Sequence, residues 1–75
     1  RYKHYYKDVS DLTEIDVYAV IRLWDVDCPA VAHAIKKLLC AGNRGHKDRA
    51  TDLQEAIDSI FRAKELDSQI SCTNQ

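Results

Sequence analysis

The fold of this chain is decided by residues 33–48, which read HAIKKLLCAGNRGHKD. The first part of this stretch has apolar residues at helical spacing and ends at Gly42. A short loop follows, and a second amphipathic segment begins at Asp48. Because glycine is typical of the position that follows a helix, the stretch predicts two helices joined by a turn.

The two helices can be extended outward from this turn. Asp27, ahead of Cys28 and Pro29, is a typical start signal, so the earlier helix is expected over residues 29–41. Its predicted buried stripe holds Val31, Ile35, Leu38 and Leu39. The later helix is expected over residues 48–66, where one face holds Ala50, Leu53, Ile57, Ile60 and Phe61. Residues 67–75 turn polar and are expected to form a loosely ordered tail.

A further helix is expected before these two, over about residues 12–24. Ser10, Asp11 or Asp16 can cap it. Its apolar positions are Val17, Val20, Ile21 and Trp24. Residues 2–7 carry three tyrosines and predict an extended aromatic arm or a short edge strand. We expect Tyr2, Tyr5 and Tyr6 to pack on the helices as a lid and not to stack on nucleic-acid bases.

The chain is therefore expected to be one small all-α domain of three helices over residues 1–75. The predicted core combines the apolar faces of all three helices: Val17, Val20, Ile21, Trp24, Val31, Ile35, Leu38, Leu53, Ile57, Ile60 and Phe61. A chain of 75 residues buries a small share of its surface, so we expect a homodimer or a higher oligomer.

Composition limits the classes of function. The formal net charge is −1, from 11 basic and 12 acidic residues, so nucleic-acid binding is not expected. There is no apolar run of membrane-spanning length. The odd number of cysteines, 3, favours a reducing cytoplasm over a disulfide framework. The chain begins with Arg1, so we expect its natural start to lie upstream.

Several kinds of chemistry do not fit the sequence. The segment from Gly42 to Gly45 lacks the length and the hydroxyl residue of a phosphate-binding loop. The spacings Cys28-x4-His33 and Cys40-x5-His46 lack the close cysteine pairs of zinc sites, and Cys40 is expected to be a buried or half-buried apolar residue. We therefore expect no catalytic residue, no metal and no cofactor.

Positive charge is concentrated around the predicted turn. Cations beside a helix start favour a bound anion such as a phosphate. The same residues also fit an ordinary solvated loop, and lysines late in a helix complement its dipole. The candidate binding residues for a ligand or a partner are Lys36, Lys37, Arg44, His46, Lys47 and Arg49.

Seven short motifs, in order along the chain, resemble the SaV-like family of small phage proteins, which includes a T7-type phage nucleotide kinase. They are His4-Tyr5, Ile15-Asp16-Val17, Ala34-Ile35-Lys36-Lys37-Leu38, Ala41-Gly42, Lys47-Asp48, Asp52-Leu53-x-Glu55-Ala56 and Arg62-Ala63-x-Glu65. The resemblance implies a phage or prophage accessory protein that acts in a bacterial cytoplasm.

Two classes of function remain open. The first is a non-catalytic protein that binds and inhibits a host or phage protein, such as a bacterial defence protein. The second is an oligomer that binds a nucleotide or another phosphorylated small molecule through the basic residues around the turn.

Overall fold

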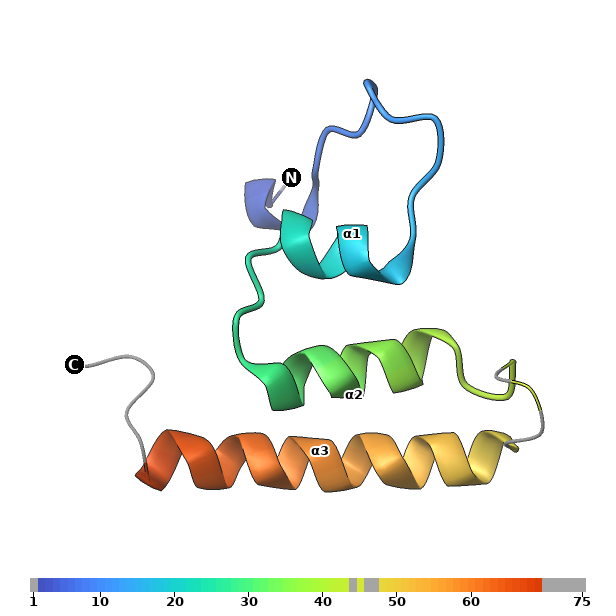
Figure 1. Cartoon of the computed structure of the whole chain (residues 1–75). Helices are drawn as coiled ribbons and strands as arrows, with labels where there is room; N and C mark the ends of the chain where they lie inside the picture. Colours follow the sequence, from blue (N-terminus) through green and yellow to red (C-terminus); the bar gives the residue numbers. More distant parts are fainter. Residues whose placement is uncertain (1, 44, 46–47, 70–75) are drawn as a thin grey trace.

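The structure, a computed structural model, describes residues 2–43, 45 and 48–69. Over these residues it contains a 3-10 turn, η1 (Lys3–Tyr5), and the helices α1 (Val17–Leu23), α2 (Pro29–Leu39) and α3 (Arg49–Gln69). The helices lie side by side with α2 between α1 and α3 (Figure 1). The expected all-α class is confirmed, and within the described ranges no residue forms a strand.

The helix α1 is shorter than the expected range of residues 12–24 because its cap lies late. Asp16 has extended backbone angles, and its side chain accepts a hydrogen bond from the Ala19 N–H at 2.8 Å. Such a cap fixes the first turn at Val17. The helix ends before Trp24, and the next residue, Asp25, has a φ of 54°, which turns the chain toward α2.

The boundaries of α2 and α3 also differ from the expected ones. The N-cap residue of α2 is Cys28 and not Asp27, no side chain caps the helix, and α2 ends at Leu39. The turn that follows uses Gly42 at a φ of 81°, which favours glycine. The helix α3 continues to Gln69, so residues 67–69 are helical, whereas the rest of the expected tail lies outside the described residues.

The buried core consists of small side chains, so the prediction of a core of large residues was wrong. The buried apolar residues are Ala34, Ala41, Ala56 and Ala63. Alanines let α2 and α3 approach closely, which leaves larger neighbours beside the contact and not within it. The exposed members of the predicted core are Trp24, Val31, Leu38, Ile57, Ile60 and Phe61. The other members, Val17, Val20, Ile21, Ile35 and Leu53, are half-buried.

Candidate functional site

The six basic residues singled out in the sequence fall into two groups. Arg44, His46 and Lys47 lie outside the described residues. Lys36, Lys37 and Arg49 are described, and each of these three has a different environment.

Lys37 is buried between α2 and α3 and is already paired. Its Nζ lies 2.6 Å from Glu55 Oε1 and 4.0 Å from Asp52 Oδ1. The side chain of Asp52 is fully buried, and its Oδ2 accepts a hydrogen bond from the Gly42 N–H at 2.9 Å. These contacts tie α2, the turn and α3 together, so the charge of Lys37 stabilises the helix pair and is not presented to a ligand.

Lys36 and Arg49 lie in environments that differ from that of Lys37. The Nζ of Lys36 lies 5.0 Å from the centre of the Tyr18 ring, so this lysine connects α2 with α1 through a cation–π contact. Arg49 is exposed at the first residue of α3, and its Cβ lies beside Gly42. The structure therefore does not bring the three described cations to one common point.

The start of α3 carries its own negative charge. Asp48 Oδ1 accepts a hydrogen bond from the Thr51 N–H at 2.8 Å. This bond holds the pKa of the Asp48 carboxyl below its ordinary value. A carboxylate at this position occupies one of the N–H groups that an external phosphate would use.

The aromatic arm forms a second and more coherent candidate site. We define the N-terminal aromatic surface as Tyr2, His4, Tyr5, Tyr6 and Trp24. The ring centres of Tyr2 and Tyr5 lie 5.5 Å apart, and the His4 ring meets the Tyr5 ring edge to face at 5.3 Å. Tyr2 and Tyr5 are each 69% exposed, so the arm is not a buried lid. The backbone is a 3-10 turn, not an edge strand.

A long-range hydrogen bond fixes this surface to the helical part of the molecule. Trp24 Nε1–H, at the end of α1, donates to the backbone oxygen of His4 at 2.9 Å. Two backbone bonds, from Tyr5 to Tyr2 and from Tyr6 to Lys3, close the turn. The rings of η1 are thus presented to solvent on an ordered backbone.

Charged groups border the aromatic surface. Lys3, Lys7 and Asp8 line a shallow depression together with Tyr6. The Nζ of Lys7 also lies 5.6 Å from the centre of the Trp24 ring. The tyrosines were predicted from the sequence as a feature of this segment, but Lys3 and Lys7 were not among the predicted binding residues, although both lie beside the aromatic cluster in the sequence.

Other kinds of site find no support in the part of the chain that is described. Over these residues, no three or more His, Cys, Asp or Glu side chains gather in a way that could hold a metal ion. Cys28 and Cys40 are free, half-buried thiols, as expected for Cys40. No helix in the described ranges combines the length and the hydropathy that crossing a membrane requires.

Comparison with known proteins adds no assignment: no family model, no curated protein and no solved structure matches this chain.

Proposed function

We propose that the chain acts without catalysis, by binding another protein through its N-terminal aromatic surface. The observation that carries the proposal is the pair of tyrosines, Tyr2 and Tyr5, each 69% exposed on an ordered turn. Tyrosine and tryptophan are the residues that contribute most often to binding hot spots.

The fixed backbone of η1 favours binding because less conformational freedom is lost when a partner docks. The Trp24–His4 hydrogen bond and the two turn bonds hold the backbone that carries the rings in place before binding. Affinity then depends on the contact made and not on ordering the arm. Lys3 and Lys7 beside the rings favour a partner surface with carboxylates around an apolar patch.

The biological setting of this proposal rests on the resemblance to SaV-like phage proteins. It implies that the partner is a bacterial protein, such as a component of a defence system, and that the chain inhibits it in the bacterial cytoplasm. Expression of the chain should then let a phage multiply on a strain whose defence system otherwise blocks it.

The second candidate function, binding of a nucleotide or another phosphorylated molecule, has less support. Lys37 is already paired with Glu55, and Asp48 occupies the start of α3. Of the six predicted binding residues, Lys36 and Arg49 are the described ones that are not paired with Glu55 or Asp52. Calorimetry of the chain against a panel of nucleotides separates the candidates, because heat of binding with any of them favours this second function.

A pair of matched variants tests the proposed surface. Tyr5→Ala removes a ring of the aromatic surface, whereas Tyr18→Ala removes a similarly exposed ring of α1, at 64% compared with 69%. We expect Tyr5→Ala to weaken binding of a protein partner purified with the wild-type chain about tenfold or more, and Tyr18→Ala to bind normally.

The same two variants can contradict the proposal. If calorimetry gives the same partner affinity for Tyr5→Ala and wild-type chains, the aromatic surface does not form the interface with the partner. Both variants must first show the helical circular dichroism of the wild type.

A further inference from the structure

The hairpin of α2 and α3 has one apolar broad face, and this face follows from the order of residues in the two helices. The positions in mutual contact include Ala34 and Lys37 in α2, and Ala56 and Ala63 in α3. In both helices, the residues that directly follow the contact positions form a stripe next to the contact line. The stripe holds Val31, Ile35 and Leu38 in α2, and Leu53, Ile57, Ile60 and Lys64 in α3.

The two stripes lie on the same side of the hairpin. Each residue of an α-helix is rotated by about 100° from the one before it, always in the same sense. The helices run antiparallel, with His33 Nδ1 2.6 Å from Ser59 Oγ and Lys37 Nζ 2.6 Å from Glu55 Oε1. In an antiparallel pair, equal rotations from the contact line lead to the same broad face. This register also places Val31 level with Phe61.

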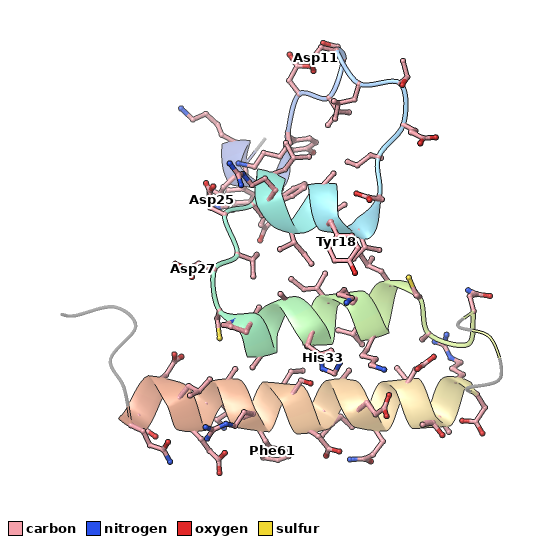
Figure 2. The ribbon with its side chains drawn as sticks, viewed as in Figure 1. Asp11, Tyr18, Asp25, Asp27, His33 and Phe61 are labelled. Carbon is pink, nitrogen blue, oxygen red and sulfur yellow. The ribbon has the colours of Figure 1, made fainter. Side chains whose placement is uncertain are left out.

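This surface, which we call the apolar face, consists of Val31, Ile35, Leu38, Leu53, Ile57 and Ile60, with Phe61 at its outer edge. Its large side chains remain open to solvent: Leu38 is 51%, Ile60 46% and Phe61 62% exposed. Figure 2 shows Phe61 projecting from the edge of α3 that lies away from α2. The residues that precede the contact positions, among them His33, Glu55 and Arg62, are polar and form the opposite face.

The extent of exposed surface exceeds that of a compact monomer. The chain exposes 6112 Å², whereas a folded monomer of 8.6 kDa exposes about 4,700 Å². Its radius of gyration of 14.4 Å compares with about 11 Å for a compact domain of 75 residues. The exposed side chains of the apolar face contribute to this whole-chain excess of about 1,400 Å², and a standard interface covers roughly 800 Å² per partner.

The apolar face also has a shape that can match a copy of itself. Ile57, Ile60, Phe61 and the stem of Lys64 line a hollow of about 250 Å³. The ring of Phe61, which is 62% exposed, forms the outer wall of this hollow. A two-fold axis brings a projection on one copy to a hollow on the other, and the reverse.

We propose that the apolar face binds a second copy of the chain, so that two α2–α3 hairpins stack face to face as a four-helix bundle. The stacking covers the large side chains that the alanine contacts within each hairpin leave outside. A net charge of −1 per chain opposes the association only weakly. The proposal concerns a different surface from the N-terminal aromatic surface, which stays free in the dimer for a protein partner.

The direct test is the mass of the wild-type chain in solution. Sedimentation equilibrium over concentrations of roughly 1 to 100 µM should give twice the chain mass of 8.6 kDa. The melting temperature should rise with protein concentration, because only folded chains associate and association therefore stabilises the folded state. The mass of a monomer at the highest concentration, together with a melting temperature that does not depend on concentration, overturns the proposal.

A matched pair of variants locates the interface. Ile60→Asp places a carboxylate on the apolar face, and Leu12→Asp places one on an equally exposed residue before α1, at 45% compared with 46%. We expect Ile60→Asp to weaken dimerisation by roughly a hundredfold or more, because two carboxylates are buried in each dimer. Leu12→Asp should dimerise as the wild type does. An unchanged dimer of Ile60→Asp overturns the proposal.

If Ile60→Asp loses its helical circular dichroism, Phe61→Asp takes its place. Phe61 is 62% exposed within one chain, so its replacement leaves the hairpin contacts intact. A folded monomer supports the interface, and a folded dimer with the wild-type dissociation constant contradicts it. Neither outcome affects the test of the aromatic surface, which reads partner binding by Tyr5→Ala.

Discussion

The α2–α3 hairpin and the segment that carries η1 and α1 are held together in different ways. The hairpin buries alanines and a lysine–carboxylate cluster along its length. The helix α1 has 7 residues and buries none of them. Its neighbours hold it through a few exposed contacts, such as Lys36 with Tyr18 and Trp24 with His4. Since so short a helix is unstable alone, the stability of the chain must come mainly from the hairpin.

The largest effect should come from the buried ion cluster of the hairpin. Lys37→Met removes the ammonium that lies 2.6 Å from Glu55 and 4.0 Å from the fully buried Asp52. We expect a loss of about 3 kcal/mol in the free energy of unfolding, because the buried carboxylate keeps its desolvation cost without this lysine. Urea denaturation followed by circular dichroism measures the loss. Lys36→Met, which removes a lysine at the α1 contact, should cost much less, and equal losses would contradict the comparison.

Close helix contact in the hairpin should give the next effect. Ala56 is 1% exposed, so Ala56→Leu forces α2 and α3 apart. We expect about 2 kcal/mol of destabilisation in urea denaturation from this overpacking. Ala50→Leu makes the same chemical change at an exposed position of α3 and should change stability by less than about 0.5 kcal/mol. Tolerance of leucine at both positions would show that the hairpin does not depend on small side chains.

A smaller and local effect is expected in the other region. Trp24→Phe keeps an aromatic ring but removes the N–H that donates to His4. We expect about 1 kcal/mol or less in global stability, with faster amide exchange at Tyr5 and Tyr6 and unchanged exchange in the hairpin. Hydrogen exchange followed by nuclear magnetic resonance measures both regions in one sample. Faster exchange throughout α2 and α3 would mean that the two regions unfold as one unit.

The smallest effect concerns acid pH. Hydrogen bonds from Thr51 and from Ser10 lower the pKa values of Asp48 and Asp8, respectively, below 3.8. A pKa lowered by folding contributes stability above the unfolded value, and this contribution is lost as the pH falls through the folded value. The melting temperatures of the wild type and of Asp48→Asn should therefore differ at about pH 6 and become equal as the pH falls to about 2.

Asp8→Asn is the matched control for this pH series. Asp8 lies in the segment before α1, whereas Asp48 caps a helix of the hairpin. We expect Asp8→Asn to leave the melting temperature of the hairpin unchanged across the series. A similar effect of both substitutions would show that the two regions share their stability equally.

Local signals in the sequence determined the helical class and the approximate position of each helix. Pro29 starts α2 and Gly42 follows its end, and the proline ring and the positive φ of the glycine act within a few residues. Spacing of apolar residues also identified the stripe of α3 that carries Leu53, Ile57 and Ile60. The sequence did not determine the start of α1, because Ser10, Asp11 and Asp16 are all suitable caps and Asp16 is the one that caps the helix.

Tertiary structure alone decided what these stripes contact. Periodicity shows which side chains share a helix face, but alanines and large residues lie on adjacent stripes in both helices of the hairpin. Close packing selected the alanine stripe, with Lys37 and Asp52 inside it, and left Ile60 and Phe61 exposed. The same packing turned Lys36 toward Tyr18 and Lys37 toward Glu55, although the two are neighbours in sequence. Which stripe meets another helix depends on how closely two backbones can approach, and that distance is a property of the pair.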